Sequence, residues 1–177
     1  TFTPATDWNG NLSFGYQVSD GNGGVVSNTA TFAVNPVNDP PVAGDVDLQD
    51  VHQDTSLTIY ASELLANSYD VDSGDTISIT SLTLSNPAAG TLVDNGDGTW
   101  TFTPPENWNG SLSYNYDVSD GNGGHAAGVA SLTVNPVNDA PVASPVDLGS
   151  MNEDAGSLTI TMAQLLAGAS DADGDVL

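Results

Sequence analysis

Asn135-Pro136-Val137-Asn138-Asp139-Ala140-Pro141 decides how the chain is divided, because Asn35-Pro36-Val37-Asn38-Asp39-Pro40-Pro41 stands 100 residues before it. Each string lies between two alternating apolar runs, a pattern in which one strand ends and another begins. The prolines fix φ and lack an amide donor, so a sheet ladder does not continue through them. The Asn and Asp between them offer oxygen ligands. We interpret 35–41 and 135–141 as the first and second joints between structural units, with a hinge and a metal site both open.

The repeat extends well beyond the joints, which is typical of a tandem array. Thr1–Pro4 recurs as Thr101–Pro104, and Val18–Gly24 recurs unchanged as Val118–Gly124. We therefore predict three parts: the C-terminal part of one repeat (1–39), a complete repeat (40–139) and the N-terminal part of another (140–177). A unit of about 100 residues can bury its own core, whereas the two flanking parts are expected not to. Since the pattern is interrupted at both ends, we expect this chain to belong to a longer protein.

The charge of the chain is one-sided. Its 177 residues include 23 Asp and Glu but no Lys or Arg, giving a net charge of −23. Two carboxylates about 6 Å apart repel by roughly 3 kcal/mol at an effective dielectric near 20, so carboxylates are expected either to face water or to surround a cation. Nucleic acid is not expected as a partner, and anionic membrane surfaces are poor partners, because both need basic patches. No apolar run is long enough for membrane insertion.

Apolar residues alternate through most of the complete repeat, which predicts half-buried strands. One such run is Leu112, Tyr114, Tyr116 and Val118. A hairpin turn is predicted at 94–98, where glycines can supply positive φ. Short helices are predicted at 61–66 and 162–167, and a bulge or break near Thr80-Ser81, where the alternation changes phase. About seven strands in about 100 residues favour an all-β fold of the immunoglobulin-like sandwich type.

Several motifs in this order resemble one family. They are the joint at 138–141, Glu153-Asp154, Leu165-Leu166, the acidic loop 171–175, the hairpin 94–104 and Asp120-Gly121-Asn122-Gly123-Gly124. Together they resemble the bacterial cadherin-like tandem repeats of large adhesins of the repeats-in-toxin type. The resemblance implies tandem antiparallel β-sandwiches of the immunoglobulin or cadherin-like type, joined by short linkers rich in Pro, Asn and Asp. It also implies an extracellular or bacterial cell-surface location and Ca²⁺ at the joints.

The resemblance further implies which residues bind Ca²⁺. Ca²⁺ takes six to eight oxygen ligands, and no single loop here has the full EF-hand pattern, so ligands must be pooled. For the first joint the expected ligands are Asn38, Asp39, Asp70, Asp72 and Asp120. For the second they are Asn138, Asp139, Asp171 and Asp173, with Asp54 and Glu106 from the complete repeat. Glu153 is a further expected ligand. Because Gln53 stands where the next repeat has Glu153, and Ser73 lengthens the first acidic loop, we expect the first joint to have the fuller set.

Simpler interpretations remain for individual residues. Asp94 and Asp97 are typical turn formers. Trp8, Trp100 and Trp108 could stack on sugars but are more typical of core or corner packing. His52 and His125 are not repeated, and no nucleophile or acid–base pair is apparent. We therefore expect no catalytic residues and no enzymatic activity.

The sequence predicts a calcium-rigidified extender or stalk of a large secreted or cell-surface bacterial adhesin, whose partners are neighbouring repeats of the same chain. Two alternatives stay open. One is an adhesive module that binds a glycan or another surface. The other is a filament subunit, in which 140–177 of one copy joins 1–39 of the next head to tail.

Overall fold

The computed structural model describes all 177 residues and is almost entirely β, so the predicted all-β class is confirmed. The strands are β1 (Gly10–Ser19), β2 (Val25–Val34), β3 (Val46–Asp47), β4 (Val51–His52), β5 (Leu57–Tyr60), β6 (Ser78–Leu84), β7 (Thr91–Asp94), β8 (Thr99–Thr103), β9 (Gly110–Ser119), β10 (His125–Asn135), β11 (Val142–Ala143) and β12 (Ala169–Ser170). The helices are α1 (Ala61–Leu64), the 3₁₀ turn η1 (Pro87–Ala89) and α2 (Met162–Leu165). Both predicted short helices are therefore present.

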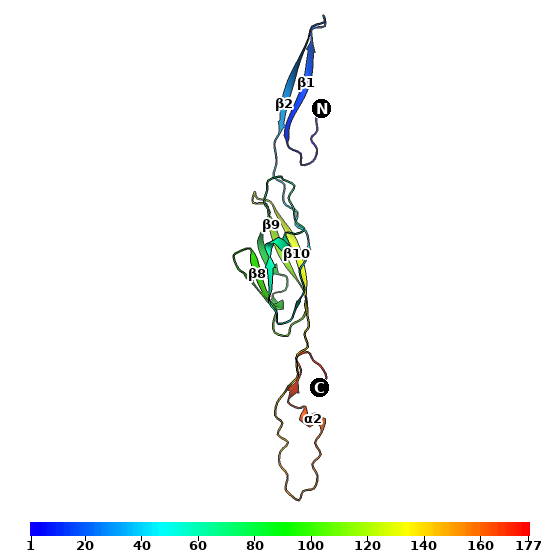
Figure 1. Ribbon diagram of the computed structural model, residues 1–177, viewed down its shortest axis with the longest axis vertical. Helices are drawn as coiled ribbons and strands as arrows, with labels where there is room; N and C mark the ends of the chain where they lie inside the picture. The colour runs from blue at the N-terminus through cyan, green and yellow to red at the C-terminus, as the bar shows by residue number, and fades with distance from the viewer. The chain divides into compact units, whose positions relative to one another are not determined.

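The strands of the predicted complete repeat form two sheets (Figure 1). One has the order β3-β10-β9-β6, with β4 also paired to β10, and the other has the order β5-β8-β7. β4 runs parallel to β10, with Val51 beside Val134 and His52 beside Asn135. This parallel pair departs from the antiparallel pattern we expected. It arises because β4 and β10 run in the same direction towards the second joint.

Contacts divide the chain into two compact units. The first comprises Thr1–Val46, Tyr60–Thr83 and Asn115–Ala130, and the second comprises Asp47–Ile59, Leu84–Tyr114 and Ser131–Leu177. The first joint lies wholly in the first unit and the second joint wholly in the second. Each joint can therefore be described within one unit. The predicted division at 39/40 and 139/140 stays a prediction.

The alternation predicted for 112–118 is present in β9. Leu112, Tyr114, Tyr116 and Val118 are each at most 8% exposed, whereas Ser111 and Asn115 face solvent. A period of two places these four residues on one face of β9, and that face is the buried one. Trp100 is also buried, which confirms its assignment to the core.

Two local predictions have different outcomes. The hairpin is confirmed: β7 and β8 pair antiparallel from Thr91–Thr103 to Asp94–Trp100, and Gly96 and Gly98 have φ of 77° and 82°. At Thr80-Ser81 no break occurs, because β6 is a single continuous strand. Its alternation does change phase there, with both residues exposed before Leu82 becomes buried. A bulge can lie within a continuous strand, so the predicted bulge stays a prediction.

The β1–β2 hairpin carries the same apolar pattern without a covering layer (Figure 1). The strands pair from Gly10–Val34 to Ser19–Val25. Phe2 lies edge-on to Trp8, Phe14 and Phe32, with ring centroids 6.2–6.4 Å apart. Phe14 is 45% exposed, whereas Tyr114, its counterpart in the complete repeat, is fully buried. The β1–β2 hairpin therefore exposes apolar side chains whose counterparts in the next repeat are buried.

Tyr114 and Tyr116 differ in how their buried hydroxyls are satisfied. The Tyr116 hydroxyl donates to the carbonyl oxygen of Gly44, whereas the Tyr114 hydroxyl is buried without a partner. Burial raises the pKa of Tyr114. Because an unsatisfied buried hydroxyl costs about 1–3 kcal/mol, Tyr114→Phe is expected to leave the free energy of unfolding unchanged or raise it. Tyr116→Phe is expected to lower it by about 1–2 kcal/mol.

Urea unfolding followed by tryptophan fluorescence measures both variants against the wild-type chain. The two substitutions remove the same atom, so each is the control for the other. An equal loss of stability in both variants would contradict the assignment of the unsatisfied hydroxyl to Tyr114.

Candidate metal centre

The first joint connects loops that are distant in sequence. β2 ends at Val34, and Pro36 follows within the joint. Asn38 Nδ2 donates to Asp120 Oδ2 at 2.8 Å, and the Asp39 amide donates to Asp72 Oδ2 at 2.7 Å. The joint is thus held by side chains 82 and 33 residues further along the chain.

Three carboxylates gather in the loop that Asp39 contacts. One oxygen from each of Asp70, Asp72 and Asp75 lies within 4.8 Å of the others, and all three residues are half-buried. Asp70 Oδ1 accepts the Asp72 amide at 2.8 Å. Asp70 Oδ2 and Asp75 Oδ2, however, are buried and accept no hydrogen bond. Because the chain has no Lys or Arg, no basic side chain is available to satisfy these two oxygens.

Asp75 was not among the ligands predicted from the sequence. Because Ser73 is an extra residue in this loop, Asp75 lies one position later than Asp175 does in the next repeat, so its spacing departs from the repeat pattern. The signal was a third carboxylate within six residues of Asp70. Only the folded loop shows that the longer spacing brings Asp75 into the cluster.

Asp120 lies at the other end of the Asn38 contact and is only 3% exposed. Its Oδ1 accepts the amides of Asn122 and Gly124 at 2.8 and 2.9 Å. The hydrogen bond from Asn38, helped by these amides, lowers the pKa of Asp120. A side chain at Gly124 would collide with Asp120 Oδ2 at 2.2 Å and with the Pro40 Cα at 2.8 Å. Both carboxylate oxygens of Asp120 therefore accept hydrogen bonds, and its assignment as a Ca²⁺ ligand stays a prediction.

Open space adjoins the cluster within the first unit. A pocket of about 250 Å³ is lined by Asp39 and Asp72 together with Asp7 and Trp8. A second pocket, of about 330 Å³, is lined by Asp72 and Asp75. Asp7 was also missed from the sequence, since its counterpart in the next repeat is Asn107. The cluster is thus accessible to a small ion and to further oxygen ligands.

The second joint repeats part of this arrangement. The Asp139 amide donates to Asp173 Oδ2 at 2.7 Å, and the Asp173 amide donates to Asp171 Oδ1 at 2.9 Å. The Asn138 side chain turns back to the carbonyl of Asp139. No three Asp, Glu or His side chains gather here within 4.8 Å of one another, as Asp70, Asp72 and Asp75 do.

The other predicted ligands of the second joint are dispersed. Asp54 Oδ1 accepts the amide of Asn107 at 2.9 Å. Glu106 and Glu153 are exposed and accept no side-chain hydrogen bond. Gln53 instead reaches the joint, with Nε2 at 3.1 Å from both the Val137 carbonyl and Asp139 Oδ2. The metal-ligand assignments at this joint stay predictions.

The repeated joints and sandwich strands agree with a comparison against known families. A family described as the cadherin-like domain matches residues 1–35, 37–135 and 137–177. The chain belongs to the cadherin-like domain family. It is thus an adhesion-type module built from repeats of one domain.

Solved structures similar to these cadherin-like repeats come from two classes of protein. An endo-fucoidan hydrolase of glycoside hydrolase family 107, MfFcnA4, is 22% identical with a TM-score of 0.38; the match covers 87% of this chain and 21% of that one. The human desmocollin-1 ectodomain is 12% identical with a TM-score of 0.32, over 76% of this chain and 29% of that one. The chain spans less than a third of either protein. No curated protein matches it.

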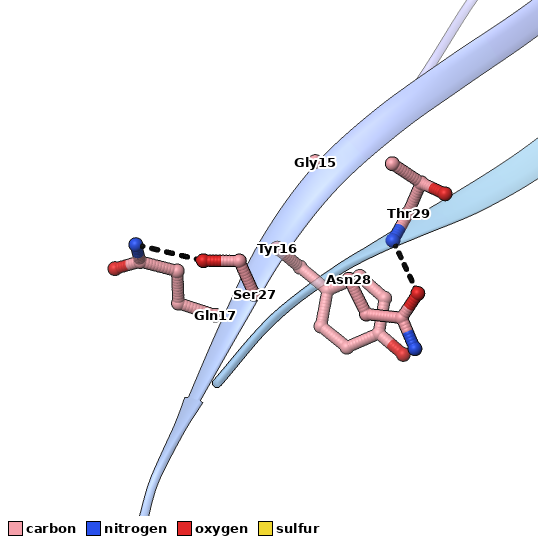
Figure 2. Close-up of a pocket in the computed structure, with 6 residues that line it drawn as sticks. All are labelled: Gly15, Tyr16, Gln17, Ser27, Asn28 and Thr29. Carbon is pink, nitrogen blue, oxygen red and sulfur yellow. Dashed lines mark hydrogen bonds between the residues drawn. The ribbon is translucent and has the colours of Figure 1, made fainter. Parts of the chain in front are cut away.

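A cavity of about 640 Å³ lies on the β1–β2 hairpin, away from the carboxylates. Figure 2 shows its lining, in which Gln17 donates to Ser27 and Asn28 accepts the Thr29 amide. In the next cadherin-like repeat the counterpart of Tyr16 is Tyr116, whose hydroxyl bonds to Gly44. In that repeat the segment at Gly44 thus contacts the corresponding tyrosine, so we do not assign the cavity as a binding site. No helix of the structure is long and apolar enough to cross a membrane.

Proposed function

We propose that these cadherin-like repeats are a calcium-rigidified extender of a large secreted or cell-surface bacterial adhesin. The observation that carries the proposal is the pair of buried, unpartnered oxygens of Asp70 and Asp75 in a loop hydrogen-bonded to the first joint. The loop and the joint are 33 residues apart. A cation bound there would connect them, which is what a stiff joint requires.

The donor set suits Ca²⁺. Carboxylate, amide and backbone oxygens are available, and the cluster contains neither Cys nor His, so the softer metals that prefer sulfur or imidazole are disfavoured. Ca²⁺ accepts six to eight oxygens in a flexible geometry, whereas Mg²⁺ requires a near-ideal octahedron. Asp70, Asp72 and Asp75 would hold the ion. When bound, Ca²⁺ would supply the positive charge that the chain lacks.

Stiffening follows from linkage between binding and alignment. An ion that binds only the aligned joint stabilises it by RT ln(1 + [L]/Kd), which is about 1.4 kcal/mol at ten times Kd. Several occupied joints would turn a flexible chain into a rod. A net charge of −23 without basic residues fits a secreted or surface-exposed protein whose counter-ions come from solution. The partners proposed for each repeat are its neighbours in the chain.

The experiment that tests the proposal combines small-angle scattering with thermal melting of the 177-residue chain. Ca²⁺ is expected to increase the maximum dimension and to raise the melting temperature by several degrees, and excess chelator is expected to reverse both. Mg²⁺ at the same ionic strength is the control. If neither quantity responds to Ca²⁺, the calcium joint is wrong. A molar mass that rises with protein concentration would favour the head-to-tail filament instead, and binding on a glycan array would favour the adhesive module.

A further inference from the structure

Gln53 connects the complete repeat to the second joint through three hydrogen bonds. It directly follows β4, and its amide donates to the Asn135 carbonyl at 2.9 Å. Its Nε2 donates to the Val137 carbonyl and to Asp139 Oδ2, both at 3.1 Å. The acceptors are every second residue of the joint, so the side chain continues the parallel β4–β10 ladder beyond the end of the strands.

The side chain is fully engaged in this role. Gln53 is 2% exposed, and its Oε1 accepts from Asn109 Nδ2 at 3.4 Å. Both hydrogens of Nε2 are directed at oxygens, so only one orientation of the amide satisfies all three contacts. A buried side chain whose donors and acceptor are all paired holds its neighbours in one arrangement. Gln53 therefore fixes the arrangement of the residues that it contacts in the second joint.

The chemistry of Gln53 contrasts with that of Glu153, the residue at its place in the next repeat. A glutamate at 53 would direct carboxylate oxygens at the Val137 carbonyl and the Asp139 carboxylate, with no hydrogen to share. Those oxygens would then require a cation between them. The two joints differ in how their second aspartate is contacted. Gln53 Nε2 donates to Asp139 Oδ2 in the second joint, whereas no donor contacts the side-chain oxygens of Asp39 in the first.

We propose that Gln53 is the residue that sets the cation dependence of the second joint, closing it by hydrogen bonds where a glutamate would demand calcium. The two joints of this chain are then unequal: the first is ordered by the ion and the second is ordered without it. An adhesin stalk built from such joints would keep some of its joints stiff at low calcium. The statement that the first joint is ordered by calcium rests on the proposed function, but the hydrogen bonds from Gln53 to the second joint do not.

Amide hydrogen exchange of the full chain, resolved by residue, tests the inference in chelator and in Ca²⁺. In chelator, protection of the wild-type Asp139 amide is expected to exceed that of the Asp39 amide at least tenfold, and Ca²⁺ is expected to remove most of the difference. Gln53→Glu is expected to lose at least tenfold protection at Asp139 in chelator and to recover it in Ca²⁺. Gln53→Met, which keeps the length of the side chain without charge or donors, is expected to lose protection in both conditions.

Asp94→Asn is the control, because it removes one charge in the β7–β8 turn, where Asp94 accepts the Gly96 amide, and it should leave the protection of both joint amides unchanged. Protection of β9 and β10 amides reports whether each variant still folds. If the Asp139 amide stays protected without Ca²⁺ in both Gln53→Glu and Gln53→Met, the claim that the Gln53 hydrogen bonds order the second joint is wrong. Strong Ca²⁺ dependence of the wild-type Asp139 amide would also overturn it. Failure of the proposed calcium function has a different signature: Asp39 would not respond to Ca²⁺, while the chelator results at Asp139 would still hold.

Discussion

Asp75→Asn is expected to stabilise the first unit in chelator and to destabilise it in Ca²⁺, relative to the wild-type chain. Carboxylate oxygens in the cluster lie within 4.8 Å of one another. Two charges about 5 Å apart repel by about 3 kcal/mol at an effective dielectric near 20, and water around half-buried groups reduces this. Removing one charge should therefore raise the free energy of unfolding in chelator by about 1 kcal/mol. In Ca²⁺ the same change should weaken binding at least tenfold, a loss of about 1.4 kcal/mol. The variant should be more stable than wild type without calcium and less stable with it.

Calorimetric Ca²⁺ titration and thermal melting in both conditions measure the two halves of this prediction. Asp94→Asn is the matched control: it removes one charge in the β7–β8 turn, where asparagine can accept the Gly96 amide as Asp94 does. The control should shift melting by the same small amount with and without calcium. An unchanged calcium affinity in Asp75→Asn would exclude Asp75 as a ligand.

Phe102→Ala is expected to cost the complete repeat about 3–5 kcal/mol, the usual range for deleting a buried phenylalanine. Phe102 is fully buried, lies edge-on to Tyr114 at 5.8 Å and pairs across the β7–β8 hairpin with Leu92. Its counterpart Phe2 is 44% exposed, so Phe2→Ala is expected to cost about 1 kcal/mol or less because little area returns to water.

Urea unfolding of both variants provides the comparison, with tryptophan fluorescence as the signal. The two substitutions are chemically identical and occupy the same place in successive repeats, so the difference between them reports the covering sheet alone. A loss of about 1 kcal/mol or less in Phe102→Ala would mean that the core of the complete repeat does not depend on Phe102.

Much of the fold could be predicted because its signals are local. The alternation from Leu112 to Val118 determines which residues of β9 face the core, and Asp94–Gly98 determines a tight turn. The two short helices were predictable from local sequence in the same way. The change of phase near Thr80-Ser81 was also predictable, but alternation did not determine whether the strand breaks or continues there, because strand continuity depends on the pairing of the backbone.

The candidate site was less predictable, because the spacing of acidic residues does not state which oxygens find a donor. Asp72 and Asp120 were both expected as ligands of one site. In the structure Asp72 joins Asp70 and Asp75, whereas Asp120 is satisfied by Asn38 and by backbone amides. Gln53 was regarded only as a missing ligand, yet it makes direct contacts with Val137 and Asp139. Such differences arise from side-chain directions in the folded chain.

By itself, the sequence determined that this chain is an acidic array of repeated all-β units with two Pro-, Asn- and Asp-containing joints. These properties follow from composition, from alternation and from the recurrence of one string after 100 residues. Only the tertiary structure decided that Asp75 belongs to the carboxylate cluster and that Gln53 holds the second joint. The physical reason is that hydrogen bonds and ion sites depend on distances of a few ångströms between residues that are far apart in the chain.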